Sequence, residues 1–344
     1  MTLCPRTIWP AWKRSRNVWP RSKRGGRFAA TPARWRRRRN GGMKFGQARL
    51  SSGAVHAVVL DGDEFVDISD AARGIVAIHD FLDLALARGE SLTAVLERAA
   101  AGATLRYEAT TLLAGHESRG ARLTMPIAPR DAWGCGVTYK RSAEFRDQDA
   151  AGGTRGIYDY VYSAERPETF YKGNAAHTVG SFEAIGIRRD STFTAPEPEL
   201  ALVLDSRGTI VGFTCSNDVS AWDIERENPL YLPQSKVFRA CLAIGPLVVT
   251  PDEVGSGMDL NLRCRIIRDG NAILDGSVNT SQIGRTFAQL IEFLTRDNPI
   301  GNGTILCTGT GVIAQRQHAL REGDAVEITI DRIGTLVNPV KRLV

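Results

Sequence analysis

The stretch Thr194–Lys236, TAPEPELALVLDSRGTIVGFTCSNDVSAWDIERENPLYLPQSK, decides the fold prediction. It indicates a β-hairpin, because an apolar strand at 200–204 and a return strand at 209–215 flank a turn at 206–208. If the turn closes a three-residue loop, residue 205 pairs with residue 209 and the rest of the register follows.

Acidic side chains gather where the two predicted strands are furthest from the turn. Glu197 and Glu199 point to one face because side chains alternate along a strand. The register places Glu199 opposite Cys215 and Glu197 opposite Asn217, so a bulge or turn must re-aim Asp218 onto the face of the pair. Three close carboxylates repel one another unless a cation lies among them, and oxygen ligands favour Mg²⁺, Mn²⁺ or Ca²⁺. We therefore predict a metal site; the alternative is an exposed Glu197 and a helix-capping Asp218.

The motifs E-P-E-L-A-L-V-L-D and N-D-V-S-A-W-D, followed by Q-S-K-V-F and A-I-G-P, resemble the fumarylacetoacetate hydrolase superfamily. The segments E-R-P-E-T-F-Y-K, E-N-P-L-Y-L-P-Q-S-K and R-D-N-P-I with G-T-I-L-C-T-G-T resemble its sugar-acid dehydratase branch. The likeness runs from about Trp133 to the C-terminus. It implies a β-rich α+β fold, with a mixed β-sandwich or roll as catalytic domain and a small α+β N-terminal domain. It also implies a homo-oligomer, either a dimer or a tetramer.

The resemblance implies a reaction as well as a fold. A 2-oxo acid offers two oxygens to a divalent ion, which stabilises the enolate formed when a C3 proton leaves. Loss of the C4 hydroxyl then dehydrates a 2-keto-3-deoxy sugar acid, such as 2-keto-3-deoxy-D-arabinonate, with Mg²⁺ as the expected cofactor. The alternative is a C–C hydrolase of acylpyruvate or fumarylacetoacetate type, or an oxaloacetate-type decarboxylase, at the same metal.

One departure from the family pattern bears on that choice. Hydrolases of the superfamily carry a His three residues and a Glu six residues after a Tyr, and here Tyr139 is followed by Ser142 and Phe145. This undercuts a water-activating pair. We assign Glu144 as general acid/base for the leaving hydroxyl, the alternative being an exposed helix Glu. The resemblance places Lys236 beside metal and substrate, where desolvation near Mg²⁺ would lower its pKa.

Further substrate-binding residues follow from the same motifs. Lys172 is predicted to meet the substrate carboxylate or hydroxyls, although it could be only a charge at a strand end. Thr310, between two glycines, can offer a backbone N–H and a hydroxyl to the carboxylate. Arg141 and, more weakly, Arg166 are further carboxylate candidates.

The basic charge of the chain is confined to its opening. Residues 1–42 hold 13 Lys/Arg and no Asp or Glu, so the formal net charge of +6 becomes −7 for the remainder. The opening could be a nucleic-acid arm, a targeting peptide or the product of a misassigned start before Met43. We favour the last and expect disorder, so nucleic acid is not an expected partner.

The remainder divides into a domain at 43–125 and a catalytic domain at 126–344. Scattered cysteines without a C-x-x-C pair indicate buried thiols in a reducing cytoplasm, and no apolar run reaches the ~20 residues of a membrane helix. Helices are predicted at 76–88, 91–100, 140–149 and 281–295, a loop or lid at 150–163, and sheet strands at 236–243 and 247–250.

Overall fold

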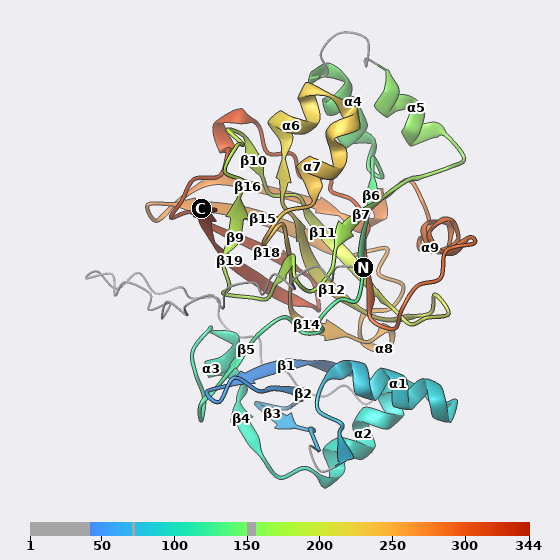
Figure 1. Ribbon diagram of the computed structural model, residues 1–344, viewed down its shortest axis with the longest axis vertical. Coiled ribbons are helices and arrows are strands. Elements are labelled where there is room, and N and C mark those ends of the chain that lie inside the picture. Colours follow the sequence, from blue (N-terminus) through green and yellow to red (C-terminus); the bar gives the residue numbers. More distant parts are fainter. Residues whose placement is uncertain (1–41, 71–72, 150–155) are drawn as a thin grey trace, which may run out of the picture. The chain divides into compact units, whose positions relative to one another are not determined.

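The computed structural model describes residues 42–70, 73–149 and 156–344 (Figure 1). The predictions for 1–42, apart from Gly42, and for 150–155 fall outside these ranges. None of the helices in the described ranges has the length and apolar character needed to cross a membrane.

The first described segment is a small α+β unit, as predicted. Two helices, α1 (Ile78–Arg88) and α2 (Leu92–Gly102), are separated by Gly89, whose left-handed backbone (φ 64°) ends α1. Ser91 caps α2 by accepting the N–H of Ala94. The remaining elements are β1 (Lys44–Leu50), β2 (Val55–Asp61), β3 (Glu64–Asp67), β4 (Arg106–Glu108), α3 (Ala109–Leu113) and β5 (Ala121–Leu123).

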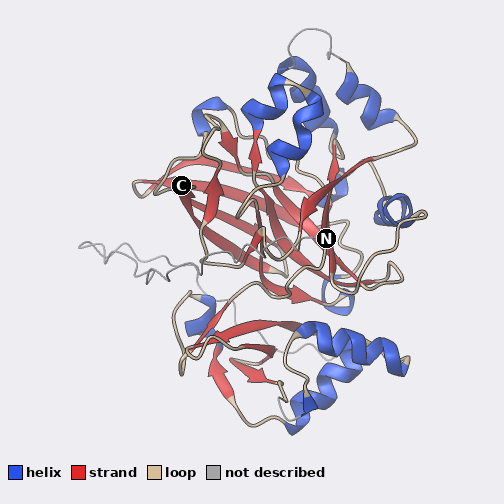
Figure 2. Cartoon of the chain, viewed as in Figure 1, coloured by secondary structure: helices blue, strands red, loops and turns tan. Residues whose placement is uncertain are grey.

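Strands dominate the rest of the chain, as Figure 2 shows, and the predicted β-rich α+β class is confirmed. The largest sheet has the order β4-β3-β2-β1-β14-β12-β11-β17-β6-β7, with β5 on β1 and β8 on β14. Its other strands are β6 (Ala132–Gly136), β7 (Glu168–Gly173), β8 (Thr178–Val179), β11 (Pro198–Leu204), β12 (Ile210–Asp218), β14 (Leu242–Val249) and β17 (Thr304–Cys307). Because β1 pairs with β14, residues 43–125 share this sheet, and the boundary at 125/126 stays a prediction.

A second sheet of five strands has the order β16-β15-β18-β19-β9. It comprises β9 (Ile185–Ile187), β15 (Asn261–Arg268), β16 (Asn271–Asn279), β18 (Ala325–Ile330) and β19 (Gly334–Arg342); β10 (Thr194–Ala195) pairs separately with β13 (Ser220–Ala221). Leu200, Leu202 and Leu204 of β11 pack in a core with this second sheet, whereas Ala201 and Val203 pack in a core with α1 and α2. Both faces of β11 are buried, which explains its unbroken apolar run.

Helices of the catalytic part differ from the predictions in places. The helix α4 (Lys140–Asp149) is confirmed, but residues 157–163 form a helix, α5 (Ile157–Ser163), because Asp147 of α4 accepts the N–H groups that begin it. Residues 281–286 are not α-helical; α9 (Phe287–Thr295) begins after its cap Thr286. The other helical elements are α6 (Trp222–Glu227), η3 (Pro229–Tyr231), α7 (Leu232–Lys236), α8 (Pro251–Val254), η4 (Thr280–Gln282) and η5 (Arg316–His318).

The strand prediction at 236–243 is also wrong. Lys236 ends α7, and β14 begins only at Leu242, because Pro233 starts a helical turn and the chain re-enters the sheet after it. Strand β14 then continues through 247–249 as one element, as Figure 1 shows beside β12.

The predicted hairpin forms β11 and β12, but its register is displaced by one residue. Leu204 pairs with Ile210 as the turn requires, whereas Val203 pairs with Gly212, so Val211 is an extra residue in β12. Beyond this bulge Glu199 lies opposite Ser216 rather than the predicted Cys215. The displacement brings Asp218 opposite Glu197, which is the re-aiming that the carboxylate cluster requires.

Candidate metal centre

Three buried carboxylates meet where β11 begins and β12 ends. One oxygen each of Glu197, Glu199 and Asp218 lies within 4.8 Å of the others. Glu197 and Asp218 share a face because the N–H of Asp218 donates to the carbonyl oxygen of Glu197 over 2.9 Å. The structure thus brings the three predicted ligands together in the interior.

Glu197 presents one oxygen to three donors. Its Oε1 accepts the indole N–H of Trp222 at 2.6 Å and lies 3.1 Å from both Arg146 Nη2 and Lys236 Nζ. Burial by itself raises the pKa of Glu197, but the positive charges of Lys236 and Arg146 outweigh it and lower the pKa to about 2. Glu197 is therefore ionised, and all three of these donors meet the same oxygen, Oε1.

The surroundings of Glu199 shift its pKa in the opposite direction from that of Glu197. Its Oε2 accepts the backbone N–H of Gly309 at 2.7 Å. Burial, then the negative charges of Asp218 and Glu197, raise the pKa of Glu199 well above its usual value. Ionising Glu199 therefore calls for a positive charge inside the cluster.

Two buried lysines, Lys172 and Lys236, contact Asp218. Lys172 Nζ lies 2.5 Å from Asp218 Oδ1 and donates to the carbonyl oxygens of Val219 and Lys236. Lys172 thus makes two hydrogen bonds to carbonyl oxygens, and its positive charge forms an ion pair with Asp218. Lys236 Nζ donates to Asp218 Oδ2 at 3.0 Å and to Ser220 Oγ at 2.7 Å. The contacts of Lys172 are thus those of a residue that positions Asp218.

The lowered pKa of Lys236 is predicted for a lysine beside Mg²⁺, and the surroundings of Lys236 without an ion act in the opposite direction. Burial alone lowers the pKa of Lys236, but the carboxylates of Asp218 and Glu197 outweigh burial and raise it. Without a metal ion, these carboxylates therefore keep the pKa of Lys236 raised. Lys236 is an ammonium in this setting, able to donate hydrogen bonds or a proton.

The charges around the cluster fit a divalent cation. Lys172, Lys236 and Arg146 supply three positive charges, and five acidic side chains surround them: Glu168, Glu197, Glu199, Asp218 and Glu225. Among these described side chains, full ionisation leaves two negative charges. An all-oxygen set with this imbalance matches Mg²⁺ better than zinc.

Sequence reasoning missed several residues of this centre. Arg146, on the inner face of α4, pairs with both Glu197 and Glu225 and lies 5.2 Å from the ring of Trp222. The partly buried Glu168 lies nearby, and desolvation, then the charge of Glu225, raises its pKa. Alternation along β7 could have found it, since residues 168, 170 and 172 share a face and Lys172 was already singled out.

Two glycines of β6 leave room for the side chains on that face of the neighbouring strand β7. A Cβ on Gly136 would stand 1.8 Å from Glu168 Oε2, and one on Gly134 would stand 2.3 Å from the ring of Phe170. Phe170 in turn lies 5.1 Å from Lys236 Nζ. The W-G-C-G motif therefore lets Glu168 and Phe170 approach the cluster.

Other predicted residues are placed less centrally. Glu144 is half exposed and lies 3.8 Å from Lys140, on the side of α4 away from Arg146, because two residues turn a helix by about 200°. Arg141 is exposed on the same helix, and Arg166 lies over the ring of Phe293. Thr310 is buried and its hydroxyl bonds the backbone of Val312. Their substrate contacts stay predictions.

The two positions that distinguish hydrolases are also defined. Ser142 is a buried residue of α4, and the ring of Phe145 lies 6.0 Å from that of Trp222. Neither side chain can activate water as a His and Glu pair would.

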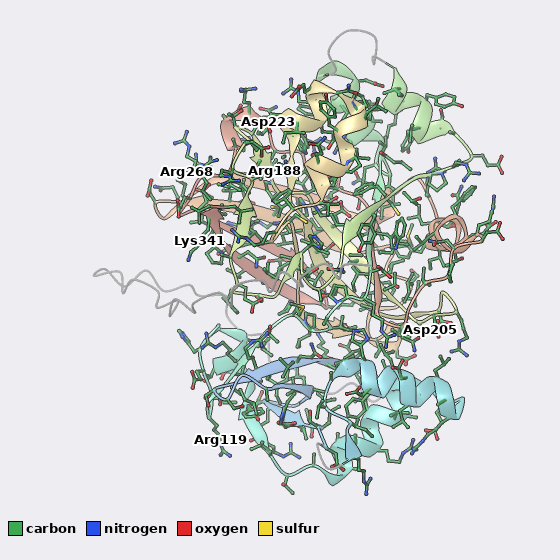
Figure 3. All side chains as sticks on the ribbon, viewed as in Figure 1. Arg119, Arg188, Asp205, Asp223, Arg268 and Lys341 are labelled. Atoms are coloured by element: carbon green, nitrogen blue, oxygen red, sulfur yellow. The ribbon has the colours of Figure 1, made fainter. Side chains whose placement is uncertain are left out.

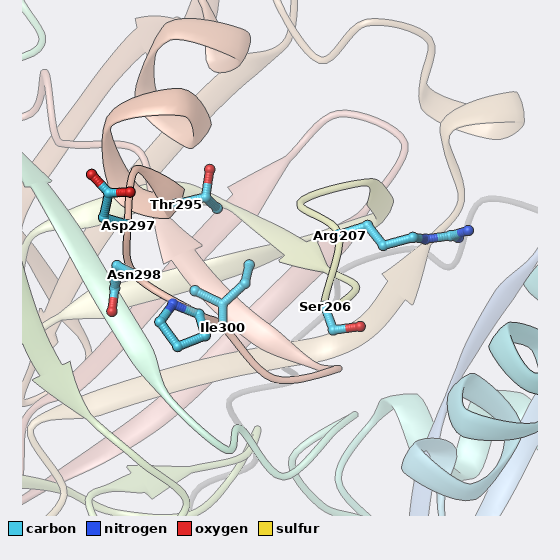
Figure 4. A pocket seen from close by; sticks show the side chains of 7 residues that line it. Ser206, Arg207, Thr295, Asp297, Asn298 and Ile300 are labelled. Carbon is cyan, nitrogen blue, oxygen red and sulfur yellow. The ribbon is translucent and has the colours of Figure 1, made fainter.

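A surface cavity of about 340 Å³ lies elsewhere (Figure 4). It is lined by Ser206, Arg207, Thr295 and residues 297–300, beyond the turn end of the hairpin. At about 3.3 Å per strand residue this is roughly 20 Å from Glu199. The cavity is separate from the carboxylate cluster.

Comparison with known proteins places this centre in context. The profile of the fumarylacetoacetate hydrolase C-terminal family matches residues 159–341. The chain is 47% identical, over 67% of its length and 78% of the relative, to "2-dehydro-3-deoxy-D-arabinonate dehydratase" of Saccharolobus solfataricus. It is 44% identical, over 63% of its length and 74% of the relative, to "Probable 2-keto-3-deoxyxylonate dehydratase" of Haloferax volcanii.

The fold agrees with a solved structure that carries a ligand. A structure of "2-keto-3-deoxy-D-arabinonate dehydratase complexed with magnesium and 2,5-dioxopentanoate" superposes with a TM-score of 0.75 at 38% identity, over 88% of this chain and 99% of that one. The matched family profile covers the strands that carry the carboxylates. By sequence, fold and centre, this chain belongs to the fumarylacetoacetate hydrolase family.

Proposed function

We propose that this protein is a Mg²⁺-dependent hydro-lyase that converts a 2-keto-3-deoxypentonate into 2,5-dioxopentanoate and water. The observation that carries the proposal is the buried cluster of Glu197, Glu199 and Asp218, in a chain similar to dehydratases of 2-keto-3-deoxypentonates. A relative of the same fold binds magnesium and 2,5-dioxopentanoate, the product that this reaction would give. Glu197, Glu199 and Asp218 would hold the ion, which supplies Lewis-acid polarisation of the 2-oxo group.

The reaction balances without a co-reactant. The C3–H bond breaks and its electron pair forms the C3–C4 double bond while the C4–O bond breaks, and the hydroxyl leaves with a proton as water. A C5 proton then leaves and C3 regains a proton, which gives an enol with a C4–C5 double bond. The enol loses the proton of its C5 hydroxyl while C4 gains a proton, and C5 becomes the aldehyde. Protons must therefore move at C3, at C4 and its oxygen, and at C5 and its oxygen.

Three side chains are proposed for these proton transfers. Lys236, held as an ammonium by Asp218 and Glu197, donates a hydrogen bond to developing negative charge on the substrate. Glu168 has a pKa raised by burial and by Glu225, which suits a carboxyl group that must both accept and donate protons. Glu144 stays the proposed acid/base for the C4 hydroxyl, on the helix whose inner side reaches Glu197 through Arg146.

Substrate binding is proposed for residues near the same centre. Thr310 and the backbone of the Gly309–Gly311 loop would meet the substrate carboxylate, and Arg141 would do so from α4. Lys172, which is fully buried and pairs with Asp218, would act by positioning Asp218. We further propose a cytoplasmic location, since the described cysteines are buried free thiols, and a homo-oligomer, which the family resemblance implies.

Ser142 and Phe145 favour dehydration over hydrolysis. The alternative of an acylpyruvate hydrolase at the same metal would need a base that activates water, and these positions offer none. A hydrolase would thus have the metal ion but no base to activate its water nucleophile. A decarboxylase needs no such base, and oxaloacetate in the substrate panel tests it.

A substrate panel tests the proposal. Purified protein with Mg²⁺ is incubated with 2-keto-3-deoxy-D-arabinonate, 2-keto-3-deoxy-D-xylonate, an acylpyruvate and oxaloacetate, and the products are identified by NMR. We expect 2,5-dioxopentanoate from one or both pentonates, no turnover with EDTA, and none from the Glu199→Gln variant. Pyruvate and a carboxylic acid from the acylpyruvate, with the pentonates untouched, would show a hydrolase instead.

A further inference from the structure

The guanidinium of Arg146 is built into the interior between two carboxylates. Its Nη2 lies 3.1 Å from Glu197 Oε1, and its Nη1 donates to Glu225 Oε1. The side chains of Arg146, Glu197 and Glu225 are all largely shielded from solvent. Arginine suits this place because its planar fork can reach two acceptors at once, which an ammonium cannot do in the same geometry.

Aromatic rings enclose the guanidinium. Its central carbon lies 5.2 Å from the ring of Trp222 and 5.8 Å from that of Tyr158. Trp222 also donates its indole N–H to the same oxygen of Glu197 over 2.6 Å. The guanidinium of Arg146 thus lies over the ring of Trp222, and both side chains contact Oε1 of Glu197.

Three elements converge on Glu197 through this contact. Arg146 comes from α4, Trp222 and Glu225 from α6, and Tyr158 from α5, which Asp147 joins to α4 by accepting the N–H groups of its first turn. In Figure 1, α4 and α6 lie close together at one end of the strands. The contact therefore fixes a metal-cluster carboxylate to helices outside the sheet.

We propose that Arg146 is a positioning residue for the metal centre: by occupying Oε1 of Glu197 together with Trp222, it turns the other oxygen toward the ion. This inference rests on the proposed metal site. Partners of this kind orient ligands, and their removal commonly weakens metal binding about 10- to 100-fold. A purely electrostatic role predicts the reverse, because removing a cation near a metal site strengthens the binding of Mg²⁺.

Calorimetric titration of the full chain with Mg²⁺, without substrate, separates these effects. We expect Arg146→Met to bind Mg²⁺ about 10- to 100-fold more weakly than the wild type. Arg146→Lys retains the charge and should still bind more weakly, because one ammonium cannot bridge both carboxylates. Arg296→Met is the matched control: Arg296 also stacks on an aromatic ring and pairs with a carboxylate, but on the surface, and its loss should leave Mg²⁺ affinity unchanged.

A double variant guards against misfolding. Arg146→Met leaves Glu225 as an uncompensated buried charge, which can prevent folding. Arg146→Met with Glu225→Gln removes both charges together and should fold, yet still bind Mg²⁺ about 10- to 100-fold more weakly. If this double variant regains wild-type affinity, Arg146 serves only Glu225 and the inference is overturned.

The indole N–H of Trp222 supplies a readout independent of turnover. Its NMR resonance, assigned with Trp222→Phe, should shift on Mg²⁺ binding in the wild type and be displaced already without Mg²⁺ in Arg146→Met, because Glu197 is no longer held. Equal affinity and an unmoved resonance in every Arg146 variant would overturn the inference alone. A wild type that does not bind Mg²⁺ would overturn the proposed metal site itself.

Discussion

Glu197 and Asp218 face each other across the β11–β12 ladder, joined by the N–H of Asp218 donating to the carbonyl oxygen of Glu197 over 2.9 Å. This pairing depends on Val211, the extra residue that shifts the ladder beyond the turn. Opposed residues of a ladder share a face, so the two carboxylates converge on Glu199, which lies two residues along β11 from Glu197. A local irregularity near the turn thus determines the geometry at the far end of the hairpin.

The buried carboxyl group of Glu199 is expected to destabilise the folded protein when no metal ion is bound. Glu199→Gln removes the carboxylate whose pKa is raised by burial and by Asp218 and Glu197, while its amide oxygen can still accept the N–H of Gly309. We expect a higher Tm than wild type in EDTA and at least about 100-fold weaker Mg²⁺ binding. Thermal scans with EDTA and with Mg²⁺ measure both; an equal stabilisation of variant and wild type by Mg²⁺ would contradict the ligand assignment.

Gly309 should be irreplaceable by alanine. A Cβ there would lie 2.0 Å from Thr138 Oγ1, and the backbone has φ +95°. Gly309→Ala should destabilise the fold by about 1–3 kcal/mol and displace the N–H that bonds Glu199. Gly270→Ala is the control, with φ +80° but nothing within 4 Å, so it carries the backbone strain without the clash. Urea unfolding and Mg²⁺ titration compare them; equal losses in both variants would show that strain alone matters.

Asp205 should make the hairpin sensitive to acid. Burial raises the pKa of Asp205, but the side chain of Arg207 and the N–H groups of Thr209 and Arg207 outweigh it and lower the pKa. Its folded pKa is therefore below the unfolded value of about 3.9, so its stabilisation is present above that pH and lost as the pH falls through the folded pKa. Figure 3 labels Asp205 at the hairpin turn.

Asp205→Asn tests this directly. We expect the free energy of unfolding at pH 7 to fall by about 1–2 kcal/mol, and the difference from wild type to shrink below about pH 4. Asp190→Asn is the control, because Asp190 pairs with Arg188 on the surface, where ion pairs contribute about 0–1 kcal/mol. A difference for Asp205→Asn that stays constant from pH 7 to pH 2 would refute the assignment.

Kinetic measurements should distinguish the catalytic roles proposed for Glu144 and Glu168. A residue that transfers a proton in the reaction is expected to cost about 10²- to 10⁴-fold in kcat when changed to the amide, with little effect on Mg²⁺ affinity. Glu144→Gln and Glu168→Gln are compared in single-turnover dehydration of the pentonate. A wild-type kcat in Glu144→Gln would transfer the acid/base role to Glu168.

Lys236 is expected to act in turnover. Lys236→Met removes the ammonium that contacts Glu197 and Asp218, and we expect kcat to fall about 10²- to 10⁴-fold. The variant also removes one of the cations that compete with Mg²⁺ for those carboxylates, although Arg146 and Lys172 remain beside them, so Mg²⁺ affinity should not fall. Steady-state kinetics at saturating Mg²⁺ measure the first, and titration the second; an unchanged kcat would leave Lys236 with a structural role only.

Local patterns in the sequence were enough for much of this protein. The alternation of Glu197 and Glu199, the apolar run after them and the turn at 206–208 determined the hairpin and the metal cluster, because period-two spacing and turn chemistry act over a few residues. The helices predicted at 76–88 and 91–100 from apolar spacing and Gly89 lie at 78–88 and 92–102, and the polar helix at 140–149 has its predicted bounds.

Only the tertiary structure decided how the cluster is held. Arg146 reaches Glu197 from 51 residues away and Gly309 reaches Glu199 from 110 residues away, across pairings that no local pattern encodes. The sequence predicts a substrate contact for Lys172 but does not show that its ammonium lies buried against Asp218 and the carbonyl oxygens of Val219 and Lys236. Buried charges and N–H groups must find partners wherever the fold supplies them, so their roles depend on contacts between distant segments.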